Sequence, residues 1–134
     1  MIAAGSEPLP QAALRKCILV VEDEVLIRSL VSDELRDEGY VVVEAFNADE
    51  ALDILKTEIC IDLIFSDVRM PGLLDGMDLL AIVRNSRPTL PVVITSGHLE
   101  PTIALEKGAA QFVGKPYFTG VIIAVVNSVL AAAE

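Results

Sequence analysis

Polar and charged side chains stand directly after four of the apolar runs in this sequence. The first run is followed by Glu22, Asp23 and Glu24, the third by Asp67, the fourth by Ser96 and Gly97, and the fifth by Lys115. Packed carboxylates repel one another, and a hard divalent cation such as Mg²⁺ relieves that repulsion. An ammonium group opposite the metal would neutralise a phosphoryl group under attack by a carboxylate. A hydroxyl and a backbone N–H could hold the remaining phosphoryl oxygens.

Each of these residues also has an ordinary structural interpretation. The three acids after the first run could cap a helix, since acids favour helix N-termini. Asp67 could begin a turn toward Pro71 and Gly72. Ser96 could start a plain loop, and Lys115 could be a solvated charge. Chance explains each residue alone, but it does not explain all of them at the one crevice that the predicted fold offers.

The elements that must position these residues alternate along the chain. The predicted strands are Cys17–Val21, Tyr40–Val43, Ile61–Ser66, Pro91–Thr95 and Ala110–Val113. Helical spacing follows each strand. In the first helical segment, Ile27, Leu30, Val31 and Leu35 form an apolar face that is expected to pack on the sheet, and the other face is charged. The other helical segments begin after the N-cap Asn47 and extend over Gly76–Arg87, from Pro101 to Gly108, and over Phe118–Ala133. Five such alternations predict an α/β fold with a parallel sheet covered on both faces. In such sheets ligands bind at the carboxyl ends of the strands.

Composition narrows the function classes. The net charge of −10 argues against direct DNA binding and against binding to anionic membrane surfaces. Because 53% of the residues are hydrophobic, a folded core is expected. Met1–Gln11 lacks the features of a signal peptide, and Val121–Ala133 is shorter than the ~20 residues that span a bilayer, so a cytoplasmic protein is expected. Cys17 and Cys60 fit no zinc pattern and are predicted to be small buried residues. Residues 1–15 are predicted to form a mobile arm, and residues 16–134 one domain.

Five sequence pieces, taken in order and spacing, resemble the bacterial response-regulator receiver domain. They are Val20-Val21-Glu22-Asp23-Glu24, Asp67-Val68-Arg69-Met70-Pro71, Asp75-Gly76, Pro91 to Gly97, and Gly114-Lys115-Pro116-Tyr117. The resemblance extends from about Lys16 to the end. It implies a flavodoxin-like, doubly wound, five-stranded parallel sheet with strand order 2-1-3-4-5 and five helices.

The resemblance also implies roles for individual residues. Asp67 would be the phosphoacceptor. Mg²⁺ would be held by Asp23, Asp67 and the backbone carbonyl of Arg69, with Glu22 acting through water. Lys115 would pair with the phosphate, and a cis bond before Pro116 would aim it inward. Ser96 would hold a phosphoryl oxygen and move together with the aromatic switch residue Phe112. The phosphodonor would be a sensor histidine kinase or a histidine phosphotransfer protein, and a further protein would be the target.

The sequence departs from the common receiver pattern in two places. The segment Gly72-Leu73-Leu74 makes the connection between Asp67 and Gly76 one residue longer. The segment from Ser96 to Lys115 is about one helical turn shorter, so a short or distorted fourth helix is expected. Arg69, Gly97 and His98 flank the phosphoacceptor. They are either ordinary exposed loop residues or residues that control access of water and donor, and thereby the phosphorylation lifetime.

The last predicted helix is unusually apolar for a surface element. Ile122, Val125, Val126 and Val129 can cover the sheet, while Val121, Ile123 and Leu130 are left for the rim. These rim residues predict either a partner or homodimer surface, or burial beneath the N-terminal arm. Since the chain stops at Glu134, soon after this helix, a free-standing domain that acts through another protein is expected.

Three other function classes compete with a signalling switch. A phosphatase that works through an aspartyl phosphate usually carries an acid two residues after the nucleophile, where this chain has Arg69. A flavodoxin-like cofactor module needs a Gly/Ser/Thr-rich phosphate loop after the first strand, where this chain has Glu22-Asp23-Glu24. A receiver-like module that is not phosphorylated would only bind proteins. The switch is predicted to catalyse only its own phosphorylation and dephosphorylation, and not to be an enzyme on a separate substrate.

Overall fold

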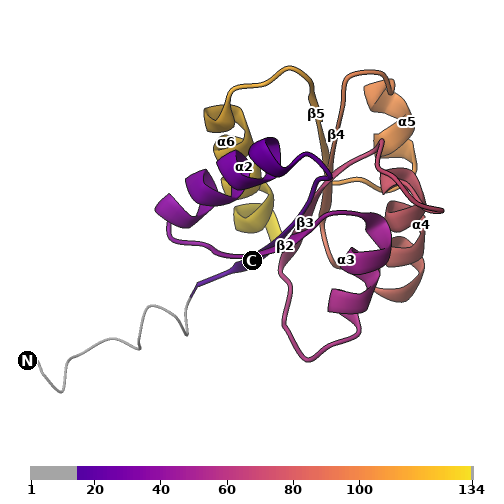
Figure 1. Ribbon diagram of the computed structural model, residues 1–134, viewed down its shortest axis with the longest axis horizontal. Coiled ribbons are helices and arrows are strands. Elements are labelled where there is room, and N and C mark those ends of the chain that lie inside the picture. The colour runs from indigo at the N-terminus through magenta and orange to yellow at the C-terminus, as the bar shows by residue number, and fades with distance from the viewer. Residues whose placement is uncertain (1–14, 134) are drawn as a thin grey trace, which may run out of the picture.

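A computed structural model describes residues 15–133 of the chain (Figure 1). The strands are β1 (Cys17–Val21), β2 (Val41–Ala45), β3 (Leu63–Asp67), β4 (Val92–Ser96) and β5 (Gln111–Gly114). The helices are α2 (Val25–Asp37), α3 (Ala48–Leu55), α4 (Gly76–Ser86), α5 (Pro101–Glu106) and α6 (Thr119–Ala133). All strand pairs are parallel, in the order β2-β1-β3-β4-β5. The predicted fold class and strand order are therefore confirmed.

Helices cover both faces of the sheet, as the apolar strands require. Helices α2 and α6 lie on one face, and α3, α4 and α5 lie on the other (Figure 1). Alternate residues of β1 serve the two cores: Ile18 and Val20 pack toward Leu35 and Ile122, whereas Leu19 faces the other layer. Every residue of β1, β3 and β4 is buried. The three central strands thus form a rigid base for the loops at their carboxyl ends.

Local sequence signals set two of the helix starts. The Asn47 side chain accepts a hydrogen bond from the Glu50 N–H at 2.8 Å, as its predicted N-cap role requires. At α4, the Asp75 carboxylate accepts from the N–H groups of Met77 and Asp78, and the Asp78 carboxylate accepts from the Asp75 N–H. This reciprocal capping box fixes the start of α4 immediately after the β3–α4 loop.

Four strands lie one or two residues further along the chain than predicted. The predictions Tyr40–Val43, Ile61–Ser66, Pro91–Thr95 and Ala110–Val113 are corrected to the bounds of β2, β3, β4 and β5. Polar residues continue the ladder at these ends, where Asp67 pairs with Thr95 and Ser96 pairs with Gly114. Two helix bounds also shift by one residue, since α4 ends at Ser86 and α6 begins at Thr119.

Several burial predictions are wrong. Leu30 is 55% exposed, because α2 turns Val31, Ser32 and Leu35 toward the sheet instead. Cys60 is exposed, because β3 begins only at Leu63 and leaves Cys60 in the preceding loop.

On α6, the buried residues are Ile122, Val126 and Leu130, so Leu130 belongs to the core and not to the rim. Val125 and Val129 are half-buried, and Val121 is 44% exposed as predicted. The predicted arm lies almost wholly outside the described residues. Among the helices of residues 15–133, none combines the length and the apolar character needed to cross a bilayer.

The predicted departures from the common pattern are visible in the two loops concerned. Helix α5 has only six residues and starts with Pro101 at its N-terminus, which confirms the expected short helix. In the β3–α4 loop, Gly72 adopts a φ of 107°, which lets the chain turn, and Leu73 is 95% exposed. The additional residue is therefore accommodated in solvent, away from the core.

Candidate functional site

Three carboxylates meet at the carboxyl ends of the central strands. Glu22 and Asp23 directly follow β1, and Asp67 ends the neighbouring strand β3. One carboxylate oxygen from each residue lies within 4.8 Å of the other two. Glu22 and Asp67 are only 2% and 7% exposed, while Asp23 is more open to solvent. The sheet thus brings together the acids that the sequence placed after separate strands.

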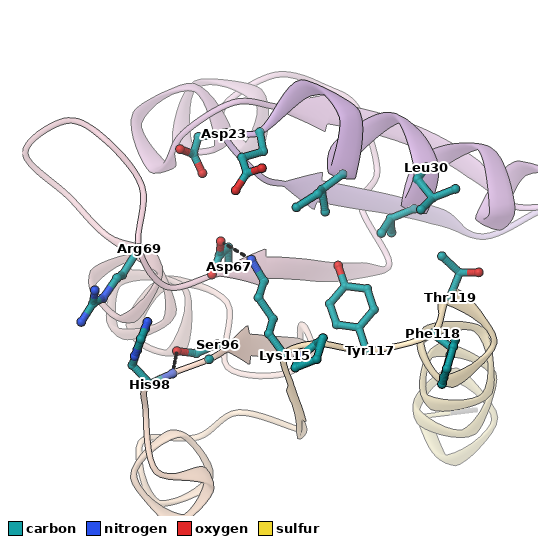
Figure 2. Close-up of a pocket in the computed structure, with 15 residues that line it drawn as sticks. Asp23, Leu30, Asp67, Arg69, Ser96, His98, Lys115, Tyr117, Phe118 and Thr119 are labelled. Carbon is teal, nitrogen blue, oxygen red and sulfur yellow. Dashed lines mark hydrogen bonds and ion pairs between the residues drawn. The ribbon is translucent and has the colours of Figure 1, made fainter.

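Lys115 closes the other side of this acidic cluster. Its Nζ donates to Oδ2 of Asp67 at 2.8 Å (Figure 2). It also lies 3.4 Å from Oε1 of Glu22. Its backbone N–H continues the sheet by donating to the Ser96 carbonyl at 3.0 Å. The Lys115–Pro116 bond is cis, as expected. The other oxygen of Asp67, Oδ1, accepts from the Val68 N–H at 2.7 Å. Both oxygens of Asp67 are therefore held in defined directions.

The electrostatics of the cluster favour a further positive charge. Burial, together with the charge of Asp67, raises the pKa of Glu22 to about 7, although the Glu24 N–H and Lys115 oppose this rise. Burial alone would lower the pKa of Lys115, but the hydrogen bond and charge of Asp67 raise it overall. One ammonium group thus faces three carboxylates. A hard divalent cation with oxygen ligands matches this donor set.

The buried carboxyl of Glu22 predicts a pH-dependent stability in EDTA. Because its folded pKa of about 7 exceeds the ordinary value of 4.5, the unfolded chain releases the proton first as the pH rises. Stability should therefore fall between about pH 4.5 and pH 7, by up to about 3 kcal/mol. The Glu22→Gln protein should not show this part of the decrease in stability. Urea unfolding of both proteins at pH 5.5 and pH 7.5 measures it, and an equal fall in both would contradict the assignment.

Most of the remaining predicted site residues line the same cleft. Ser96 is buried, and its Oγ accepts from the N–H of His98 at 3.1 Å (Figure 2). It also accepts from the N–H of Leu99 at 3.1 Å. The hydroxyl is therefore engaged by its own loop. Arg69, Gly97 and His98 are exposed, as the simpler interpretation predicted, and they line the cleft beside Asp67. Phe112 is half-buried on β5, where it packs against the core beneath α3, α4 and α5.

An apolar groove extends from the acidic cluster toward α2 and α6. We define it by Ile27, Leu30, Val31, Tyr117 and Phe118, and together with the acidic cluster it forms a cleft of about 740 Å³. Figure 2 shows Leu30 and Phe118 on opposite sides of this cleft. Phe118 is 85% exposed. The sequence does not reveal this groove, because the helical spacing of apolar residues predicts that Leu30 packs in the core.

Tyr117 forms part of the groove wall. Its ring packs edge-on against Phe65, with centroids 6.3 Å apart. Its hydroxyl is buried and has no hydrogen-bond partner among residues 15–133. Burial accordingly raises the pKa of Tyr117 to about 12. The neutral tyrosine thus contributes a mainly apolar surface beside the acidic cluster.

Comparison with known proteins identifies one family. The sequence profile described as "Response regulator receiver domain" matches residues 18–127. The nitrogen assimilation regulatory protein NtrX of Azorhizobium caulinodans is 41% identical over 104 residues, which are 75% of this chain and 23% of that protein. The transcriptional regulatory protein CpxR of Escherichia coli is 32% identical over 115 residues, which are 84% of this chain and 48% of that protein. The chain thus spans less than half the length of either relative.

Solved structures agree with the sequence matches. The crystal structure of the receiver domain of NtrX from Brucella abortus has a TM-score of 0.79 and 40% identity, and the match covers 85% of this chain and 98% of that domain. A CheY-like receiver domain protein from Methanospirillum hungatei has a TM-score of 0.82 and 25% identity, with 89% and 96% of the two chains covered. The similarity therefore includes nearly the whole of these receiver domains.

Proposed function

Because this chain belongs to the response-regulator receiver family of two-component signalling, we propose that it is a phosphoacceptor switch and that Asp67 is its acceptor. One observation carries the proposal. The buried Asp67 carboxylate lies 2.8 Å from the Lys115 ammonium, within a cluster of three carboxylates at the carboxyl edge of the sheet. Such an arrangement supports capture of a phosphoryl group, whose negative charge must be neutralised from more than one side.

The proposed cofactor is Mg²⁺. Receiver domains bind Mg²⁺ at an acidic pocket, and the donor set of this chain fits such an ion: the candidate ligands are Glu22, Asp23, Asp67 and the backbone carbonyl of Arg69. When bound, the metal would supply charge neutralisation for the phosphoryl oxygens. The clustered carboxylates give it hard oxygen ligands, and the exposed side of Asp23 leaves room for the waters that Mg²⁺ retains.

The reaction proposed at Asp67 is an in-line phosphoryl transfer. A carboxylate oxygen forms the new O–P bond, while the P–N bond of a donor phosphohistidine breaks. The bonding electron pair stays on the imidazole nitrogen, which then takes a proton from solvent. Lys115 neutralises charge on the transferred group. Hydrolysis reverses the state, as water attacks phosphorus and the Asp67 carboxylate leaves.

We further propose that Ser96 and Phe112 report the phosphorylated state. Ser96 Oγ now accepts two backbone hydrogen bonds from its own loop. The O–H of Ser96 remains available to donate to a phosphoryl oxygen, and the two accepted bonds couple any movement of this hydroxyl to its loop. Ser96 pairs with Gly114 and Ile94 pairs with Phe112 along β4 and β5, so such a movement can reach the Phe112 ring. Arg69, Gly97 and His98 are proposed to control access to Asp67 and hence the lifetime of the phosphorylated state.

The proposed phosphodonor is a sensor histidine kinase or a histidine phosphotransfer protein. The apolar groove supports a protein donor, because exposed leucine and phenylalanine next to the acceptor offer area that a small phosphodonor would not use. The downstream target is a further protein. We also propose that residues 16–134 form the receiver unit and that this unit acts in the cytoplasm without binding DNA itself. Val121 on α6 is proposed to contribute to a homodimer surface. A monomer in sedimentation with and without beryllofluoride would contradict dimerisation.

The groove predicts that protein and small-molecule donors respond differently to one substitution. Leu30→Asp places a charge in the groove but does not touch the acidic cluster. Phosphotransfer from a phosphorylated histidine kinase should slow by about tenfold or more, since a central apolar anchor is worth ~2 kcal/mol. Autophosphorylation from acetyl phosphate should stay within about twofold.

The control for this comparison is Leu105→Asp on α5. Leu105 is 45% exposed and lies on the opposite face of the sheet. Both rates are measured by radiolabel transfer. Equal slowing with both donors, or equal slowing by both variants, would show that the groove does not recognise the donor.

The proposed function itself is tested on the native chain. Incubation with acetyl phosphate and Mg²⁺ should give one phosphoadduct by intact mass. The adduct should be lost with hydroxylamine, as an acyl phosphate is, and should not form with EDTA. If no adduct forms with any donor, a protein-binding module without phosphorylation becomes the better description. Turnover of a separate phosphorylated substrate would instead favour the phosphatase alternative.

A further inference from the structure

Arg28 on α2 connects the acidic loop to the sheet. Its Nη1 donates to the backbone carbonyl of Glu22 at 2.9 Å, and its Nε donates to Oε1 of Glu44 on β2 at 3.2 Å. We propose that Arg28 is a positioning residue for the divalent-cation site. It holds the Glu22–Asp23 peptide in place through its hydrogen bond to the Glu22 carbonyl. This inference rests on the proposed function and extends it to a residue outside the acidic cluster.

The acidic loop is also restrained by hydrogen bonds of Glu24, whose N–H donates to Oε2 of Glu22 at 3.1 Å and whose carbonyl accepts from the Arg28 N–H at 2.9 Å. Glu24, the N-cap of α2, makes no side-chain capping hydrogen bond. The backbone N–H of Glu22 donates to the Ala45 carbonyl at 3.0 Å, which fixes one side of this residue. Arg28 fixes its carbonyl on the other side. Because repulsion between the carboxylates tends to separate them in the absence of metal, a restraint on this peptide keeps Asp23 close to Asp67.

Glu44 is itself held in place by a second arginine. Arg36 Nη2 donates to Oε2 of Glu44 at 3.1 Å and to the Val42 carbonyl at 3.2 Å. The Glu44 carboxylate therefore binds two guanidinium groups, of which only that of Arg28 reaches the acidic loop. The Arg28 side chain is 18% exposed, compared with 43% for Arg36. Arg28 is thus a partly buried link, and Arg36 is a matched residue in the same ion-pair network.

The chemistry of arginine suits this link. A planar guanidinium offers several N–H donors in fixed directions, so one side chain can bind a carboxylate and a carbonyl at the same time. A lysine ammonium at the end of a flexible chain can keep the charge but does not reproduce that fixed geometry. The two acceptors of Arg28 come from β2 and from the loop after β1.

Positioning and simple electrostatics predict opposite signs for the loss of Arg28. Loss of Arg28 removes a positive charge near the acids and leaves Glu44 with one cationic partner fewer. Through Coulomb attraction alone, both changes would strengthen cation binding. Loss of a positioning contact would weaken it, because residues that orient metal ligands commonly contribute about 10- to 100-fold to metal affinity. The direction of the change therefore separates the two roles.

The experiment measures Mg²⁺ binding to the full chain by calorimetry. Arg28→Gln should raise the Mg²⁺ Kd about tenfold. Arg28→Lys keeps the charge and should still weaken binding, by less. Arg36→Gln makes the same charge change in the same network without touching the loop, and should leave the Kd within about twofold.

Thermal unfolding in EDTA shows which variants are folded, and Arg28→Lys, which keeps the charge, carries the test if Arg28→Gln does not fold. An unchanged or lower Kd in Arg28→Gln, or equal weakening in Arg36→Gln, overturns the positioning role while the proposed function stands. Failure of the native chain to bind Mg²⁺ overturns the proposed metal site and this inference together. The native titration therefore distinguishes the two failures.

Discussion

Replacement of Asp67 by asparagine is expected to abolish phosphorylation from both acetyl phosphate and a histidine kinase. An amide oxygen is a far poorer nucleophile than a carboxylate, and the acceptor charge that Lys115 pairs with is removed. The amide oxygen can still accept from the Val68 N–H, so its place in the site is retained. Intact mass and radiolabel transfer both measure the loss.

The Asp67→Asn protein should still fold. The Lys115 ammonium retains Glu22 as a partner at 3.4 Å, and removal of one of three clustered carboxylates relieves repulsion. Asp33→Asn on the exposed side of α2 is the control for loss of one acid, because the Asp33 side chain is 74% exposed. It should be phosphorylated like the native chain. A phosphoadduct that persists on Asp67→Asn would place the acceptor elsewhere and end the proposal.

The architecture and the acidic cluster could be predicted because both depend on local signals. Continuous apolar runs mark strands that are covered on two faces, and the parallel connection rule places all their carboxyl ends on one edge. Once that edge is defined, the residues that follow the strands must be neighbours. Glu22, Asp67 and Lys115 therefore came together without knowledge of any side-chain contact.

Helix rotation could not be predicted in the same way. Helix α2 carries Val25 and Leu26 in addition to Leu30, so its apolar residues extend around more than one face. Which of them meets the sheet depends on packing against α6 and β2. The structure buries Ser32 and exposes Leu30, and an exposed groove results where a core residue was expected. The apolar groove that shares a cleft with Asp67 is a consequence of that rotation.

The link through Arg28 was also beyond sequence reasoning. Arg28 and Glu44 are 16 residues apart and lie on different elements. In the sequence Arg28 belongs to the charged face of a helix, which usually faces solvent. Only the parallel pairing of β1 with β2 brings Glu44 next to the acidic loop, where Val20 pairs with Glu44. Contacts of this kind depend on register, which residue types do not specify.

Replacement of Gly76 by alanine is expected to have the largest effect on the fold. A Cβ on Gly76 would lie 2.0 Å from the backbone carbonyl oxygen of Asp67 and 2.8 Å from the Val68 Cα. Both are backbone atoms at the end of the central strand, so they cannot rotate away. The Gly76 N–H also donates to the Val68 carbonyl at 2.8 Å, which holds the two segments together. Relief of the clash would have to separate α4 from β3.

Gly76→Ala should therefore lose about 3 kcal/mol or more of stability in urea unfolding. Gly120→Ala is the matched control, because Gly120 lies in the first turn of α6 with no atom within 4 Å of a Cβ. It should be neutral or slightly stabilising, since alanine has the higher helix propensity. If the Gly76 variant still folds, its Mg²⁺ affinity should fall more than that of Gly120→Ala, because the displaced carbonyl belongs to Asp67. Native-like stability together with native-like Mg²⁺ binding would mean that α4 does not pack against the acceptor strand as described.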